Sequence, residues 1–247
     1  FDAFAQRVSE HTKAVVINSP NNPSGAVYSE QTIRRLAAFL REKENEYGHP
    51  IYLISDEPYR EIVYDNVTIP FVPNYYDDTI ICYSYSKSLS LPGERIGYVL
   101  VPPKAADSAD LYAAVCGAGR ALGYVCAPSL FQRVAARCAD LTSDIAVYRT
   151  NRDLLYSGLT EMGYTCVKPE GAFYVMMNMT GFIGKTMYGK VIESAEDFSQ
   201  LFLEKGLVAT VPCTAFAAPG FVRWSYATSL TEIDKGLDRL EVFIKNA

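Results

Sequence analysis

The sequence contains only two histidines, His11 and His49, among its 247 residues. Zinc sites and Ser-His-Asp triads both draw on histidine, so this chain supplies either of them poorly. No apolar run approaches the roughly 18 residues of a membrane-spanning helix, and no signal peptide is visible. The 28 acidic and 23 basic residues leave a net charge of −5, and no basic stripe predicts nucleic-acid binding. We therefore expect a protein that binds neither membranes, nucleic acids nor a metal ion.

The cysteines also lack the pattern of a disulfide framework or a redox pair. None of them forms a Cys-x-x-Cys pair, and most have apolar neighbours. We interpret them as free thiols of a reducing compartment, which predicts a cytoplasmic protein. They are Cys82, Cys116, Cys126, Cys138, Cys166 and Cys213.

Four short runs rich in Ile, Val and Tyr predict buried strands. They cover residues 13–20, 50–59, 79–87 and 95–103. The pattern strand, helix, strand predicts an α/β domain with a mostly parallel sheet flanked by helices. The last run follows the third too closely for a helical crossover, so we expect it to pair antiparallel.

Residues 29–48 predict the helix between the first two strands. Four apolar side chains fall on one helical face, Ser29 is a candidate N-cap, and Gly48 a candidate end. The four are Ile33, Leu36, Ala37 and Leu40.

The second half of the chain has a different organisation. Residues 104–163 predict mostly helix, with a break at 123–128. The remainder reads as an α+β unit, in which Ser194 and Asp197 form a capping box and Gly206 ends the same helix. Its other expected elements are a bent strand pair at 164–179, strands at 207–216 and 221–227, and a closing amphipathic helix at 229–246. We predict a large domain at 1–142, a connecting helix at 143–163 and a small C-terminal domain at 164–247.

Polar and charged residues follow the ends of several predicted strands, where ligands bind in open α/β sheets. Lys87 is notable because an amine at the end of a core strand is costly unless it is paired or used. Each of these residues alone has an ordinary explanation as a turn, a cap or a surface charge. The set comprises Asn22, Asp56, Tyr59, Ser84, Ser86, Lys87, Arg95 and Arg223.

Together these side chains match the needs of one cofactor, pyridoxal 5′-phosphate. An amine can form a Schiff base with its aldehyde, and a carboxylate can keep its ring nitrogen protonated. Tyrosine and asparagine can hydrogen-bond its phenolate oxygen. Serine and arginine can bind its phosphate, and a second arginine can clamp a substrate carboxylate.

The chain resembles the fold type I, class I and II aminotransferases over essentially all of its length. "NNPSG", "SDEPY", "SYSK" and "FVRWSYA" resemble the family's motifs and occur in family order. The resemblance implies a PLP-transferase-like large domain with a smaller α+β C-terminal domain. It also implies transfer of an amino group between an amino acid and a 2-oxo acid.

The resemblance assigns each residue a role. Lys87 would hold the cofactor and then act as the base that moves a proton, while Asp56 would bind the ring nitrogen. Tyr59 and Asn22 would contact the phenolate oxygen, and the Asn22–Pro23 bond is a candidate cis peptide. Arg223 would bind the substrate α-carboxylate. The phosphate would be bound by Ser84, Ser86 and Arg95.

Relatives carry a further N-terminal segment, as the resemblance implies, and we expect this chain to be a fragment of a homodimeric enzyme. The missing segment normally supplies part of the phosphate site and an aromatic residue against the ring. We therefore expect the 247-residue chain to be isolated without cofactor, to lack transaminase activity and to self-associate.

Two alternatives stay open. One is a PLP-dependent C–S lyase on the same fold, and the other is an aminotransferase-like effector domain of a transcription regulator. Substrate choice is weakly marked: Arg120 lies near the position where some relatives bind a side-chain carboxylate, although a surface helix arginine explains it as well. We favour aspartate or a similar amino acid, with 2-oxoglutarate.

Overall fold

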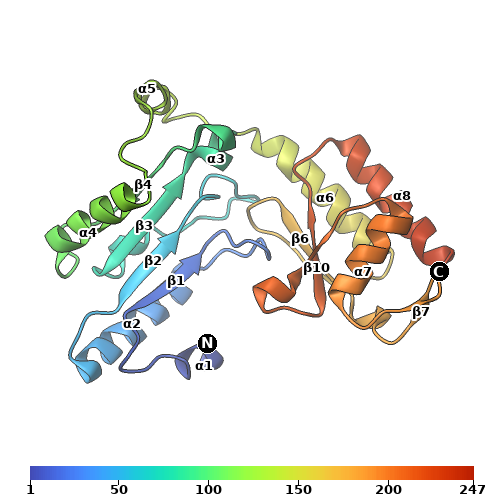
Figure 1. The fold of residues 1–247 in the computed structure, drawn as a ribbon, viewed down its shortest axis with the longest axis horizontal. Coiled ribbons are helices and arrows are strands. Elements are labelled where there is room, and N and C mark those ends of the chain that lie inside the picture. The colour runs from blue at the N-terminus through green and yellow to red at the C-terminus, as the bar shows by residue number, and fades with distance from the viewer. The chain divides into compact units, whose positions relative to one another are not determined.

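The computed structural model describes residues 1–247, and its chain divides into two units (Figure 1). The first unit comprises Phe1–Pro20, Val27–Ile62 and Asn66–Ser143. The second comprises Asn21–Ala26, Val63–Asp65 and Asp144–Ala247. Two short segments of the N-terminal half thus belong to the second unit. The predicted domain boundaries at residues 142 and 163 stay predictions.

A four-stranded sheet in the order β1-β2-β3-β4 forms the centre of the first unit. Its strands are β1 (Ala14–Asn18), β2 (Tyr52–Asp56), β3 (Thr79–Ser84) and β4 (Gly97–Leu100). The first three are parallel, with Asn18 opposite Asp56, and β4 pairs antiparallel with β3. These findings confirm the four predicted strands and the antiparallel fourth. Because parallel strands end at one edge, the residues after β1, β2 and β3 share that edge.

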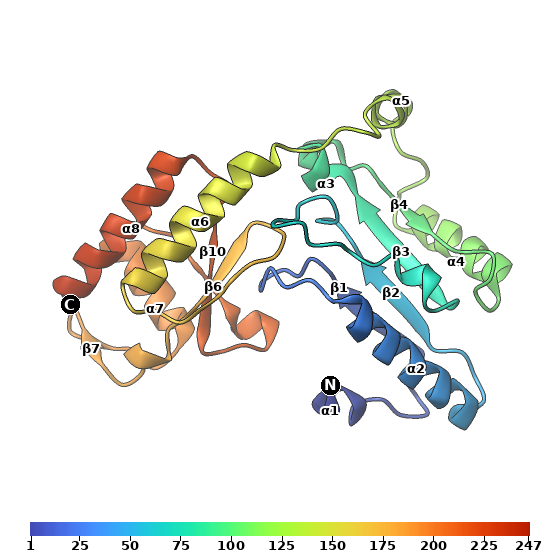
Figure 2. The ribbon, with the colours of Figure 1, turned by 180° about the vertical axis from the view of Figure 1, so that it is seen from behind.

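Helix α2 (Glu30–Tyr47) packs on this sheet, as Figure 2 shows from behind. The Ser29 hydroxyl accepts from the Thr32 N–H, and Gly48 ends the helix with a left-handed φ of 73°. The four predicted core residues of α2 are buried in a cluster with Ile17, Ile51 and Leu53 of the sheet region. The cap, the end and the buried face of this helix are thereby confirmed.

The remaining helices of the first unit are short or exposed. They are α1 (Asp2–Ala5), α3 (Tyr85–Ser88), α4 (Ser108–Ala121) and α5 (Ser129–Arg137), with 3-10 turns at Val72–Asn74 and Pro92–Glu94. No residue of α4 is buried. The helical break predicted at 123–128 lies between α4 and α5, which confirms it.

The second unit packs helices against an antiparallel sheet in the order β5-β6-β10-β9. The predicted bent strand pair and the closing helix are confirmed by β5, β6 and α8. The elements are α6 (Ile145–Glu161), β5 (Cys166–Val167), β6 (Tyr174–Asn178), β7 (Thr186–Met187), β8 (Lys190–Val191), α7 (Ala195–Leu201), β9 (Val211–Pro212), β10 (Phe221–Ser225) and α8 (Leu230–Lys245).

One local prediction in this unit was wrong in extent, and another was confirmed. The strand expected at 207–216 shrinks to β9, because a 3-10 turn begins directly after it at Cys213. The capping box at Ser194 is present, and α7 continues into a π turn, Phe202–Gly206, so Gly206 is the last helical residue as predicted. The residue after it, Leu207, takes a left-handed φ of 57°. A Cβ on Gly206 would lie 2.4 Å from the Phe202 ring, so close packing accounts for the glycine.

Residues 169–172 form the hydrogen bonds that attach the segments Asn21–Ala26 and Val63–Asp65 to the rest of the second unit. The N–H groups of Glu170 and Gly171 each donate to the Gly25 carbonyl at 2.9 Å. The Tyr64 N–H donates to the Glu170 carbonyl at 3.0 Å, and its hydroxyl donates to the Ala172 carbonyl. A Cβ on Gly25 would lie 2.5 Å from the Pro169 Cβ, so only glycine permits this approach. The loop that carries Asn22 is thereby held against β6 and its preceding turn.

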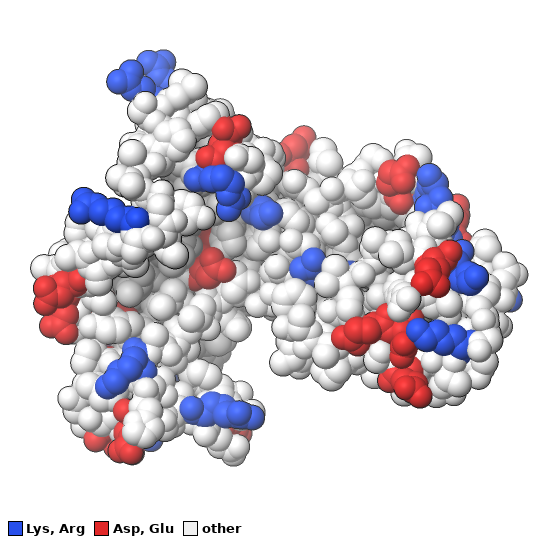
Figure 3. All heavy atoms as spheres, in the orientation of Figure 1, with Lys and Arg blue, Asp and Glu red and all other residues white.

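Three whole-chain features bear on the earlier expectations. All six cysteines are free. None of the helices has both the length and the apolar character that crossing a bilayer demands. On the face drawn in Figure 3, acidic and basic side chains are interspersed.

Candidate functional site

Asp56 ends β2 as a half-buried carboxylate with a neutral partner. The Asn18 amide donates to the Asp56 Oδ2 and to its backbone carbonyl, each at 3.0 Å. Burial raises the pKa of Asp56, the Asn18 hydrogen bond lowers it, and the neighbouring Glu57 charge raises it further. No basic side chain contributes to this balance. The carboxylate is therefore arranged to accept a cationic N–H donor.

A buried ion pair shapes the turn directly after Asp56, and the sequence analysis missed it. Glu57 is 2% exposed and accepts from the Ser55 hydroxyl at 2.7 Å and from Arg60 Nη1 at 2.6 Å. Arg60 also donates to the Ile69 carbonyl at 3.4 Å. These bonds hold the ends of the Asp56–Tyr59 turn. The spacing of Glu57 and Arg60, an acid and a base three residues apart after a buried strand, was the signal in the sequence that could have indicated this ion pair.

Lys87 lies on α3, which directly follows β3, and β3 is the neighbour of the strand β2 that ends at Asp56. The Lys87 side chain is half-buried, and its Nζ lies 5.9 Å from the centre of the buried Tyr59 ring. The structure thus brings two of the predicted catalytic residues, Lys87 and Tyr59, close together, and it places Asp56 on the same sheet edge. This proximity was expected because β2 and β3 are adjacent and parallel.

The three predicted phosphate ligands divide into a contacting pair and a separate arginine. Ser84 caps α3: its hydroxyl accepts from the Ser86 N–H at 3.2 Å and donates to the Ser86 hydroxyl at 2.8 Å. Arg95 is exposed, has a left-handed φ of 51°, and donates to the Pro92 carbonyl at 2.7 Å. Its guanidinium closes the 3-10 turn before it and makes no hydrogen bond with either serine. A shared role of all three stays a prediction.

Within the second unit, Arg223 of β10 meets the predicted Asn22. Arg223 Nη1 donates to the Asn22 Oδ1 at 2.7 Å. The guanidinium lies 4.4 Å from the Tyr174 ring centre and 5.4 Å from that of Phe216. Its Nε is buried with no hydrogen-bond partner, and an orphaned donor of this kind is costly unless a ligand meets it. A carboxylate would satisfy it in a charge-assisted bond.

The backbone of the Asn22 loop also agrees with the sequence analysis. The Asn22–Pro23 peptide is cis, which confirms that prediction. A second cis peptide, Ser19–Pro20, was not predicted.

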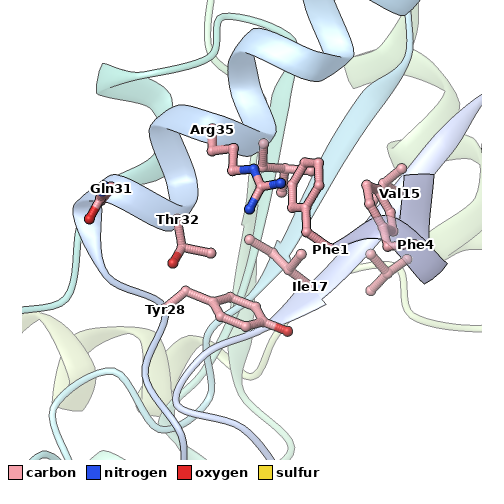
Figure 4. A pocket seen from close by; sticks show the side chains of 10 residues that line it. Phe1, Phe4, Val15, Ile17, Tyr28, Gln31, Thr32 and Arg35 are labelled. Atoms are coloured by element: carbon pink, nitrogen blue, oxygen red, sulfur yellow. The ribbon is translucent and has the colours of Figure 1, made fainter.

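Arg120 and the main cavity of the first unit have fewer polar or reactive side chains around them than the site residues described above. Arg120 is an exposed residue in the last turn of α4. A cavity of about 620 Å³ in the first unit is lined by apolar side chains of the N-terminal residues and β1, among them Phe1, Phe4 and Ile17, and by mostly polar side chains of α2. Figure 4 shows the Arg35 guanidinium beside the Phe1 ring, 4.0 Å from its centre. None of the predicted site residues lines this cavity.

Comparison with known proteins identifies relatives over nearly the whole chain. A family model described as aminotransferase class I and II matches residues 1–240. A probable N-acetyl-LL-diaminopimelate aminotransferase of Bacillus subtilis is 34% identical over 244 residues, covering 96% of this chain and 56% of its own length. A probable aspartate/prephenate aminotransferase of Aquifex aeolicus is also 34% identical, with 96% and 58% covered.

Solved structures share the fold. The crystal structure of an amino transferase from Eubacterium rectale has a TM-score of 0.87 and 53% identity, covering 99% of this chain and 58% of that one. An aspartate aminotransferase from Rhizobium meliloti has a TM-score of 0.84 and 30% identity, covering 99% and 61%. The chain thus spans just under three fifths of the length of the curated relatives named above. By sequence and by fold, this chain belongs to the class I and II aminotransferase family.

Proposed function

We propose that the natural protein containing this chain is a pyridoxal-phosphate-dependent aminotransferase that moves an amino group between an amino acid and a 2-oxo acid. The proposal depends mainly on the surroundings of Asp56. Its carboxylate is half-buried, its pKa is raised by burial, and its hydrogen-bond partner is the neutral Asn18 amide rather than a basic side chain. Such a group is unfavourable by itself and becomes favourable when a protonated ring nitrogen binds it. Lys87 and Tyr59 of the same unit supply the amine and the phenol that this cofactor needs.

The residues present fit the cofactor of this family. Pyridoxal phosphate supplies an aldehyde that an amine can attack and a protonated ring that accepts electrons. Asp56 would hold the proton on the ring nitrogen, and Tyr59 with Asn22 would donate to the phenolate oxygen. Ser84, Ser86 and Arg95 would bind the phosphate.

Two residues would handle the substrate. The Lys87 amine would bind the aldehyde carbon of the cofactor, and it would also be the group to carry a proton at the substrate α-carbon, since it is half-buried and no histidine is among the predicted site residues. Arg223 would bind the α-carboxylate, because its Nε is unpartnered and its Nη1 is oriented by Asn22.

The relatives support amino transfer over the alternatives. Those reported above are named as aminotransferases, which favours this activity over a C–S lyase or a regulator's effector domain. Aspartate or a similar amino acid with 2-oxoglutarate stays our proposed substrate pair, supported by the aspartate/prephenate relative. We also propose a homodimer, supported by the unburied helix α4, and a cytoplasmic location, supported by the six free thiols.

Substitution of the lysine tests the proposal in the natural full-length protein. Lys87→Ala should abolish the absorption of lysine-bound cofactor near the visible edge and nearly all amino transfer, because no other residue supplies the amine. Lys104→Ala, an exposed lysine of the same unit, is the matched control and should keep both. A Lys87→Ala protein that retains the absorption band would show that another lysine carries the cofactor.

A further inference from the structure

Helix α3, which carries Lys87, is too short to be stable by itself. It comprises only Tyr85–Ser88, a single turn. One helical turn orders several residues for very few hydrogen bonds, and the last carbonyls of any helix have no partner within it. The position of the Lys87 backbone therefore depends on groups outside the helix.

Ser143, more than fifty residues along the chain, supplies those groups. Its N–H donates to the Ser88 carbonyl at 2.7 Å. Its hydroxyl donates to the Lys87 carbonyl at 2.8 Å and also lies 3.0 Å from the Ser88 carbonyl. A single hydroxyl hydrogen is thus shared between the last two carbonyls of α3. The Lys87 carbonyl also accepts from the Ser90 N–H at 3.3 Å, so Ser143 adds a second bond to that carbonyl and makes two contacts to the Ser88 carbonyl.

The neighbouring residues show the same dependence on Ser143. Ser90 has a left-handed φ of 54°, which is unfavourable for a residue with a Cβ. Its hydroxyl lies 3.3 Å from the Ser143 Oγ, to which it can donate because the Ser143 hydrogen is already used. The Ser88 side chain is held separately by the Tyr83 hydroxyl at 2.8 Å. Ser143 is therefore a contact from outside the helix to the backbone from Lys87 to Ser90. It acts beside two local bonds at 3.3 Å, from the Leu89 N–H to the Tyr85 carbonyl and from the Ser90 N–H to the Lys87 carbonyl.

We infer that Ser143 is a positioning residue for Lys87, a role that rests on the proposed function of that lysine. By holding the Lys87 carbonyl, Ser143 helps to fix the backbone from which the amine extends. Ser143 is also the last residue of the first unit, and Asp144, the next residue, is the N-cap of α6. The residue that fixes Lys87 is thus covalently joined to the start of α6.

Hydrogen–deuterium exchange on the cofactor-free protein tests the structural half of this inference. Ser143→Ala should accelerate exchange of the amides in residues 85–90, about tenfold if roughly 1.4 kcal/mol of local hydrogen bonding is lost. Ser143→Thr, which keeps the hydroxyl, and Thr142→Ala, the adjacent exposed residue, should both exchange like the natural protein. Unchanged exchange in Ser143→Ala would overturn the inference. If that variant does not fold, Ser143→Cys gives the same test with a weaker donor.

Kinetics of the natural full-length protein test the functional half. Ser143→Ala should lower kcat about tenfold and shift the absorption of lysine-bound cofactor, with KM for the amino acid within about twofold. Ser143→Thr should restore both. A variant that loses thermal stability but keeps kcat and spectrum would show a purely structural role and overturn the inference. If the unsubstituted protein binds no cofactor, the proposed function is wrong. The exchange experiment on residues 85–90 would still test whether Ser143 holds the Lys87 backbone, because it needs no cofactor.

Discussion

At the scale of single residues, Asp56 shows a conflict between stability and function. Its carboxylate is half-buried beside a neutral amide, and burial raises its pKa. A carboxyl group whose pKa is raised in the folded protein stabilises the fold below its ordinary pKa, and this contribution is lost as pH rises through the folded pKa. At neutral pH the free protein therefore carries an unfavourable charge, which a cationic ligand would offset.

Asp56→Asn separates the two effects. We expect its melting temperature to exceed that of the natural protein at pH 8, because the amide carries no charge to desolvate. This difference should shrink as pH falls toward the ordinary aspartate pKa of about 3.9, because the raised pKa lets the folded carboxyl take up its proton above that pH. In the full-length protein, turnover should fall at least about 100-fold while cofactor binding stays measurable.

Calorimetry from pH 8 to pH 4 and steady-state assays check these expectations. Asp77→Asn, at an exposed aspartate of the same unit, is the control and should change neither quantity. Near-normal turnover in Asp56→Asn would show that some other group keeps the ring nitrogen protonated.

At the scale of elements, Arg152 joins α6 to the segment Val63–Asp65. The arginine is 2% exposed and donates to Asp65 at 2.9 Å, to Asp153 at 2.8 Å and to the Pro169 carbonyl at 3.1 Å. It also lies over the Tyr64 ring, 4.7 Å from its centre. Hydrogen bonds to Arg152 lower the pKa of Asp65. The arginine therefore acts mainly through packing and hydrogen bonds in the core of the second unit.

Arg152→Ala should destabilise the second unit by about 2–5 kcal/mol, the range for truncating a large core side chain to alanine. Its acidic partners are half-exposed and return to water, so they add little to this cost. Arg149→Ala, on the exposed face of the same helix, should change stability by less than about 0.5 kcal/mol. Urea unfolding monitored by circular dichroism measures both. Equal stabilities of the two variants would contradict the proposed core role.

At the scale of the whole molecule, the chain leaves several large apolar side chains unburied between residues 112 and 141. Side chains there are up to 75% exposed, although isolated large apolar residues are the normal case on a protein surface. The exposed residues are Tyr112, Leu122, Tyr124, Val125, Leu130 and Leu141. Several large apolar side chains exposed in one part of the sequence favour association, and a net charge of −5 opposes it only weakly.

We expect the 247-residue chain to self-associate in a concentration-dependent manner. Light scattering after size exclusion should give a mass above the 27.4 kDa of one chain, under reducing conditions because Cys116 and Cys126 are exposed. The double variant Tyr124→Lys, Val125→Glu should lower the mass toward that of one chain. A monomer at the highest soluble concentration would show that this surface does not drive association.

Local patterns predicted the elements well wherever the residues of an element carry their own signal. The helix from Ser29 to Gly48 has a cap, a periodic apolar face and a left-handed end within twenty residues, and all three were found. The antiparallel β4 followed from the short connection before it. The strand expected at 207–216 was too long, because its residues from Cys213 to Phe216 form a 3-10 turn instead.

The sequence by itself determined the α/β class, the strand ends that carry Lys87 and Asp56, and the chemistry of those side chains. It did so because strand periodicity and side-chain type are local properties. Only the tertiary structure decided that Glu57 is buried against Arg60, that Asn22 accepts from Arg223, and that Ser143 holds the Lys87 turn. Two of these three contacts join residues far apart in the chain, and all three depend on how deeply the polar groups are buried. Such burial and such pairings leave no periodic trace in the sequence, because they are set by packing of the folded chain.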